Sequence, residues 1–315
     1  MLDFTDFKTA LVAGCRSMLD AIPEDSILKN IELEERSVTK AQRGELSALL
    51  FRAPGTACAP TFYVEDFYGM YRDGHPLEEL YVRLVQDGIH YVTNPPSIAG
   101  IDPEALAERD GFGVRLLNKA KNHDYLKDVP HIDDIGLALI AEMRSGEFRA
   151  VITNSLMEEM GLTKEELFEK ALRESAEKDR ATLYRISDML CSPESCENLL
   201  ESGADAINES DPLLVLSNED CFWGAAALFY PGMLARLSDL LGGNFYVLPS
   251  SVHEVLLLPV SEGDPQSLAS TIREANRSVT DCSVFLADDL FVCVSGKLKQ
   301  VSFGGVIPSR GNIPC

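Results

Sequence analysis

The segment FYVLPSSVHEVLLLPV, residues 245–260, decides the fold class. It holds two apolar runs, Phe245 to Leu248 and Val255 to Val260, and each run is short enough to be a buried strand. The polar residues between the runs include Ser250 and Ser251, which are typical of a tight connection between strands. The segment therefore predicts two consecutive strands with a short turn between them.

Helix signals lie on both sides of this segment in the sequence. Thr163 is expected to be the N-cap of one helix, because Glu166 completes a capping box three residues later. Asp264, followed by Pro265, predicts the start of another helix. Further strands are expected over residues 113–117, 135–143, 148–153, 213–216, 284–286 and 290–294. Together these patterns predict an α+β fold with antiparallel or mixed sheets and flanking amphipathic helices.

The N-terminal part of the chain carries its own set of elements. Apolar residues recur at helical spacing from Phe4 onward, and Pro23 must end that helix. Alternating apolar residues between 31 and 50 predict two strands. Pro76 is expected to begin a second helix and Gly88 to terminate it.

A cluster of helix-breaking residues at 93–97 suggests a domain boundary near residue 100. We therefore expect an N-terminal α+β unit over residues 1–100, a larger α+β domain over 101–300, and a C-terminal tail over 301–315. Within the larger domain, residues 174–212 are rich in acidic and small polar side chains, which favours a weakly packed segment.

The charge balance narrows the choice of partners. The chain has 50 acidic and 28 basic residues, and its net charge is −22. This charge repels phosphate backbones and anionic membrane surfaces, so we expect neither direct binding to a nucleic-acid backbone nor membrane association. A basic or neutral protein, or a small molecule, is the expected partner of this acidic protein.

Cysteine usage and the first residues indicate the compartment. The eight cysteines are irregularly spaced, so they are expected to be free thiols. The acidic start of the chain does not resemble a signal peptide, and a cytoplasmic location is the expectation. Phosphate-binding loops, dinucleotide fingerprints and histidine pairs at helical metal spacing are all missing from the sequence. We therefore expect no cofactor and no metal ion.

Polar residues that could form a site follow three of the predicted strands. Strand ends often build functional sites, because the rigid strands position the loops that follow them. The candidate binding residues at these strand ends are Asn154, Asn218, Glu219, Asp220, Ser250, Ser251, His253 and Glu254.

Two hypotheses explain these residues. In the first, they cap a helix and close turns, and any function is one of binding. In the second, Ser250, Ser251 or Cys221 is the nucleophile of a hydrolase and His253 is its base, with Glu254 or Glu219 orienting the imidazole. A catalytic triad is recognised by its geometry, which the sequence does not contain, so whether the protein is an enzyme stays open here.

Several of these motifs occur in an order that resembles a known family. The motifs, in chain order, are KDVPH at 127–131, ITN at 152–154, LSNED at 216–220, GAA at 224–226, YPG at 230–232 and YVLPSSVHEV at 246–255. Together they resemble the bacterial family called domain of unknown function 5688, which is common in Firmicutes. The resemblance covers roughly residues 110–295, and its most specific part is the Pro-Ser-Ser-x-His-Glu-Val block. Cys221, Phe222 and Trp223 are less typical of the family.

The resemblance implies a bacterial, intracellular protein and transfers no activity, cofactor or catalytic residue. We therefore expect a cytoplasmic ligand- or protein-binding or regulatory module without catalytic activity. The alternative is the hydrolase that uses Ser250, Ser251 or Cys221 with His253 as base.

Overall fold

The computed structural model describes residues 1–54, 59–94, 111–145, 148–191, 196–203, 211–278 and 282–303, with only the backbone of Ser145, Phe148, Cys191 and Cys282. Packing divides the chain into two units, Met1–Ile101 and Asp102–Cys315. The predicted α+β class is confirmed, and all strand pairings among the described residues are antiparallel.

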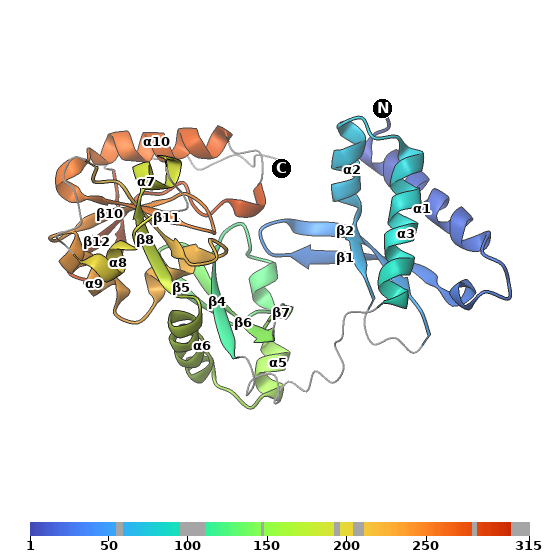
Figure 1. Ribbon diagram of the computed structural model, residues 1–315, viewed down its shortest axis with the longest axis horizontal. Coiled ribbons are helices and arrows are strands. Elements are labelled where there is room, and N and C mark those ends of the chain that lie inside the picture. The colour runs from blue at the N-terminus through green and yellow to red at the C-terminus, as the bar shows by residue number, and fades with distance from the viewer. Residues whose placement is uncertain are drawn as a thin grey trace. The chain divides into compact units, whose positions relative to one another are not determined.

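The first unit is a three-stranded sheet covered by helices (Figure 1). The side chains of Leu49 and Phe51 on one face of the sheet pack into a core with Phe7, Leu11 and Leu84 from the helices. The elements in chain order are α1 (Phe4–Asp20), the 3-10 turn η1 (Ile27–Asn30), β1 (Glu32–Lys40), β2 (Gly44–Arg52), β3 (Thr61–Tyr63), α2 (Val64–Arg72) and α3 (Leu77–Thr93).

The prediction that the second N-terminal helix ends at Gly88 is wrong. Helix α3 passes through this glycine and continues to Thr93. A Cβ atom at Gly88 would come within 2.6 Å of the Phe51 ring. The glycine is therefore needed because helix and strand approach closely here. In the sequence, such a glycine cannot be distinguished from one that ends a helix.

The second unit contains two antiparallel sheets. The first has the order β4-β6-β5, and β7 also pairs with β6. Helix α6 packs against β4 and β6. The elements of this part are β4 (Phe112–Asn118), η2 (Tyr125–Lys127), β5 (His131–Asp134), β6 (Leu137–Ser145), β7 (Phe148–Val151), α5 (Asn154–Glu159) and α6 (Lys164–Lys178).

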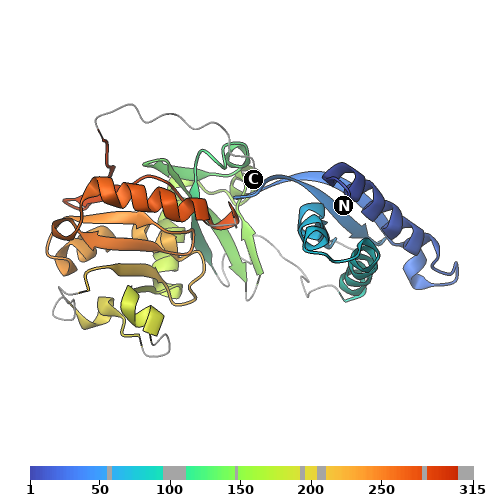
Figure 2. The same cartoon turned by 90° about the horizontal axis from the view of Figure 1, so that it is seen from above.

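The other sheet has six strands in the order β13-β12-β10-β11-β9-β8. Helix α10 runs along this sheet (Figure 2). Its Ala269 and Ile272 side chains pack in one core with Tyr246, Leu248 and Leu258 of the sheet. The elements are β8 (Ala181–Arg185), α7 (Ile186–Cys191), α8 (Leu199–Ser202), β9 (Leu214–Asn218), η5 (Gly224–Phe229), α9 (Met233–Leu240), β10 (Phe245–Pro249), β11 (Val255–Pro259), η6 (Val260–Glu262), α10 (Pro265–Ser278), η7 (Cys282–Val284), β12 (Phe291–Val294) and β13 (Lys297–Gln300).

The acidic segment 174–212 is better packed than its composition suggests. It includes strand β8, whose Leu183 is fully buried, and helix α8, which lies against that strand. Asn198 holds the two together, because its side chain accepts from the Leu183 N–H at 3.0 Å and donates to the Ala181 carbonyl at 3.3 Å. The expectation of a weakly packed segment is wrong for these described parts; residues 192–195 and 204–210 lie outside them.

The strand predicted over residues 284–286 is absent, and the last hairpin forms further along the chain. The structure pairs β12 with β13, and residues 285–286 form no strand. Ser295 and Gly296 both have positive φ, at 51° and 72°, which is the geometry of a two-residue turn that suits hairpin twist. Leu286, at the end of the apolar run 284–286, is buried, but the run is part of a connection and not of a strand.

The cap of α6 yields the first prediction. Thr163 Oγ1 accepts from the Glu166 N–H at 3.2 Å, and the Glu166 carboxylate accepts from the Thr163 N–H at 2.9 Å, so the predicted capping box is present. Thr163→Ala is expected to lower the free energy of unfolding by about 1 kcal/mol in urea denaturation. An unchanged midpoint and slope would contradict this role of the cap.

The Thr163 N–H and hydroxyl also hold the pKa of Glu166 below its usual value. A carboxyl group with a lowered folded-state pKa stabilises the fold above its unfolded pKa, and this contribution is lost as the pH falls through the folded pKa. The difference in stability between the parent and Thr163→Ala should therefore shrink in acid.

Cys15, Cys221 and Cys293 are free thiols, and burial raises the pKa of Cys15 to about 12. In the part of the chain that the structure describes, no helix has both the length and the apolar character that crossing a bilayer requires.

Candidate functional site

The polar residues that follow β9 and those that follow β10 lie together. Strand β11 pairs with both β9 and β10, and Val255 lies opposite Leu216. This register brings the end of β9 beside the connection that contains His253. The contact is direct, because Ser217 Oγ donates to the His253 carbonyl at 2.8 Å.

The two serines of the connection bind its own atoms. Ser250 Oγ donates to the Glu254 carboxylate at 3.2 Å. Ser251 Oγ accepts from the His253 N–H at 3.0 Å, and the Ser251 N–H donates to the Glu254 carbonyl at 3.2 Å. These bonds close the turn between β10 and β11, as the first hypothesis describes.

The His253 imidazole holds the neighbouring turn. Its Nδ1 accepts from the Trp223 N–H at 3.1 Å. The ring stacks on Phe222 with centroids 5.3 Å apart, and it lies 5.9 Å from the Trp223 ring. An Nδ1 that accepts a hydrogen bond keeps its lone pair, so the proton of the neutral ring resides on Nε2. In this form Nε2 is a donor and is not the base that a serine or cysteine nucleophile needs.

The turn that follows β9 is tightly constrained. Asn218 is 4% exposed, and its side chain binds both the N–H and the carbonyl of Phe222, at 3.1 and 2.9 Å. Cys221 and Trp223 have positive φ, at 50° and 57°, a conformation that costs free energy in residues with a side chain. Backbone strain of this kind occurs often at functional sites and persists only where the surroundings enforce it.

The turn exposes one aromatic side chain and two carboxylates to solvent. Phe222 is 48% exposed although it is a large apolar residue. The side chains of Glu219 and Asp220 are 50% and 67% exposed. Glu219 lies 3.3 Å from Arg180, and Asp220 lies 4.0 Å from Arg149. We call residues Glu219 to Trp223 the aromatic turn.

Asn154 has different partners from the other candidate residues. It stands at the start of α5, where its side chain donates to the Lys127 carbonyl at 3.0 Å and its N–H donates to the Asp128 carbonyl at 2.9 Å. These bonds fix the segment that precedes β5. The structure thus joins Asn218, Ser250, Ser251, His253 and Glu254 in one hydrogen-bond network, and Glu219 and Asp220 lie beside it. Asn154 belongs to a separate set of hydrogen bonds.

Sequence reasoning missed a charged network behind the aromatic turn. Arg115 places its guanidinium 4.8 Å from the centre of the Trp223 ring, a cation–π contact. The same guanidinium binds Glu142, which is fully buried and also accepts from Arg144 at 2.8 Å and from Arg149 at 3.2 Å. The signal was present in the sequence as charged residues at 142 and 144, two apart in an otherwise apolar strand.

The network balances its own charge. Arg144 also binds Asp179, so that three guanidinium groups face the carboxylates of Glu142, Asp179 and Asp220. Burial alone would lower the pKa of Arg144, but its bonds to Asp179 and Glu142 outweigh burial and raise the pKa. The aromatic turn is therefore tied to the β4–β6–β7 sheet at two points, Trp223 on Arg115 and Asp220 near Arg149.

The described residues offer no cluster of three or more His, Cys, Asp or Glu side chains arranged to hold a metal ion. The hydrolase hypothesis gains no support from the geometry, because the hydroxyls of Ser250 and Ser251 bond to Glu254 and to backbone, and His253 Nδ1 accepts from Trp223.

Comparison with known proteins adds the family relationship. A model for a family of unknown function (DUF5688) matches residues 4–292. The match begins in α1, so the relationship extends over the first unit, which the resemblance over residues 110–295 left out. No curated protein and no solved structure matches.

Proposed function

Since the chain belongs to DUF5688, a family of unknown function, we propose its function from geometry: it is a non-catalytic binding module that presents the aromatic turn to a basic protein partner. We also place it in the bacterial cytoplasm, a proposal that the free thiols of Cys15, Cys221 and Cys293 support.

One observation carries the proposal. The imidazole of His253, the residue best suited to catalysis, accepts from the Trp223 N–H and stacks on Phe222. Its role is to hold a strained turn in one conformation. A turn that is fixed before binding loses little conformational entropy when a partner docks on it.

The chemistry of the turn favours a basic partner. Aromatic rings that are rigid and exposed often supply the main binding energy of an interface. An arginine or lysine side chain of the partner can stack on the outer face of Phe222 while it approaches Glu219 and Asp220. The exposed ion pair of Glu219 with Arg180 contributes little stability, so a partner can replace it at low cost. The net charge of −22 would also speed the encounter.

The aromatic turn contains the only tryptophan of the chain, Trp223, so its fluorescence reports on this site alone. We expect a peptide of alternating glycine and arginine to change the Trp223 emission saturably. Phe222→Ala should weaken this binding about tenfold or more, since it removes the central aromatic contact.

The matched control is Tyr91→Ala, which removes an aromatic ring of nearly equal exposure, 49% against 48%, from the first unit. This variant should bind like the parent, and a peptide of alternating glycine and glutamate should not bind. Equal affinity of the parent and Phe222→Ala, or no saturable change with the arginine peptide, would rule out the aromatic turn as the binding site.

A further inference from the structure

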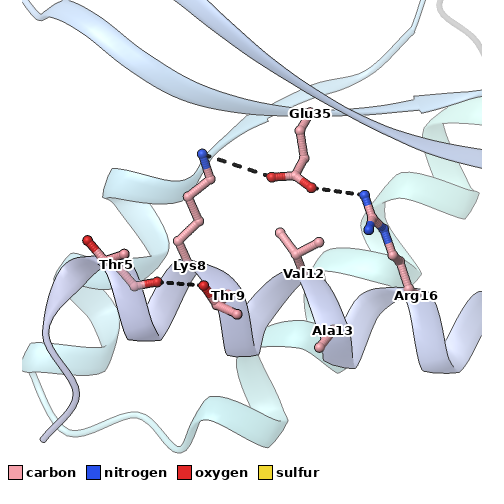
Figure 3. A pocket seen from close by; sticks show the side chains of 7 residues that line it. All are labelled: Thr5, Lys8, Thr9, Val12, Ala13, Arg16 and Glu35. Carbon is pink, nitrogen blue, oxygen red and sulfur yellow. Dashed lines mark hydrogen bonds and ion pairs between the residues drawn. The ribbon is translucent and has the colours of Figure 1, made fainter.

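A hollow of about 530 Å³ lies in the first unit between α1 and β1 (Figure 3). Lys8, Val12 and Arg16 are spaced four residues apart, so they stand in one row along the helix, and Glu35 reaches toward them from the strand. Val12 is 6% exposed, whereas Ala13 beside it is exposed. The hollow therefore combines a small apolar surface at Val12 and Ala13 with the charged groups of Lys8, Arg16 and Glu35.

The charges of the hollow do not cancel. Glu35 accepts from Arg16 Nη2 at 2.9 Å and lies 3.9 Å from Lys8 Nζ, so two cations face one carboxylate. The surplus is one positive charge on a chain whose net charge is −22. A small anion that is repelled by most of the protein is attracted at this place.

Arg16 retains the capacity to bind such an anion. Its side chain is 56% exposed, and among the described residues its recorded partner is Glu35, reached through Nη2. A guanidinium presents five N–H donors in a planar fork, and a carboxylate can accept two of them in parallel. Glu35 binds the guanidinium through Nη2, and more than half of the Arg16 side chain is exposed to solvent.

We propose that this hollow binds a small monocarboxylate, with its carboxylate on Arg16 and Lys8 and a short hydrocarbon chain over Val12 and Ala13. One negative charge neutralises the surplus of the lining. The site is independent of the aromatic turn, which lies in the other unit. Because Glu35 occupies the same two cations, its carboxylate competes with that of the ligand.

This competition gives substitutions with opposite effects. Arg16→Gln removes the bidentate partner and should weaken binding at least tenfold. Glu35→Gln removes the competing charge and should tighten binding several-fold. A hollow that is merely a gap between helix and strand predicts neither change.

The probe is sodium butyrate, titrated into the full chain at constant ionic strength while the backbone amide resonances are followed by NMR. We expect saturable shifts in residues of α1 and β1, with the affinities of the two variants displaced in opposite directions. The matched control is Arg83→Gln, which removes an arginine of similar exposure, 61%, from the same unit and should bind like the parent. Butyramide, the neutral analogue, should cause no saturable shift.

Three results would overturn the proposal. They are the absence of saturable shifts in α1 and β1 with butyrate, equal binding of butyramide, and an affinity of Glu35→Gln that is equal to or weaker than that of the parent. Circular dichroism of each variant verifies that the fold is kept.

Discussion

Replacing Glu142 with alanine is expected to destabilise the second unit by about 3–5 kcal/mol. Glu142 is fully buried and binds Arg115, Arg144 and Arg149. Its removal leaves these guanidinium groups with too little negative charge in a region of low dielectric constant. Breaking a buried ion network in this way costs far more than the network contributes in net stability, because the unpaired charges stay desolvated.

Chemical denaturation, followed by Trp223 fluorescence, measures this loss in the unit where it occurs. The matched control is Glu201→Ala, which removes a carboxylate 2.7 Å from Arg180 that is 61% exposed. Exposed ion pairs contribute at most about 1 kcal/mol. If Glu142→Ala lost no more stability than this control, the claim that the network behind the aromatic turn stabilises the second unit would be contradicted.

Replacing Gly224 with alanine is expected to cost about 3 kcal/mol, the upper range for forcing a methyl group into packed structure. A Cβ atom at this position would lie 2.6 Å from the Asn218 amide nitrogen and 2.6 Å from the His253 carbonyl oxygen, and closer still to Ser217 Oγ. Two of these neighbours are backbone atoms and cannot rotate away. The junction between β9, the aromatic turn and the His253 connection should therefore open.

Gly69 supplies the contrast for this second prediction. It lies inside α2, and a Cβ atom there would meet no heavy atom within 4 Å. Gly69→Ala should therefore stabilise the first unit by about 0.5–1 kcal/mol, because alanine has the higher helix propensity. Thermal unfolding of the two variants should move in opposite directions, and a neutral Gly224→Ala would contradict the close packing of the junction.

The elements that sequence alone predicts correctly are those set by local chemistry. Thr163 and Glu166 form their capping box within one turn, and the runs 245–248 and 255–260 form neighbouring strands because a short turn joins them. Gly88 misleads because a terminating glycine and a glycine in close packing look alike until the Phe51 ring is placed beside it. The hairpin at Ser295 and Gly296 was missed because an apolar run nearby gave the stronger strand signal.

The candidate site was predicted in part for the same reason. Strand order brings Ser217 to His253, and the polar residues at strand ends were the signal that selected the neighbouring Asn218 and His253 as candidates. The contact of Arg115 with Trp223 joins residues more than a hundred positions apart, and the acceptor role of His253 Nδ1 depends on an N–H that only the folded turn directs at it. Neither follows from residue types and spacing.

The central claim is that His253 supports the aromatic turn and does not act as a base. The tautomer of its imidazole tests this claim directly, and a long-range ¹H–¹⁵N NMR spectrum at neutral pH reports it. The chain has five histidines, so the signal is assigned by its loss in His253→Asn. We predict an unprotonated Nδ1 and a protonated Nε2, the form imposed by the Trp223 N–H. A protonated Nδ1 with a free Nε2 lone pair, the form that a general base requires, would contradict the claim.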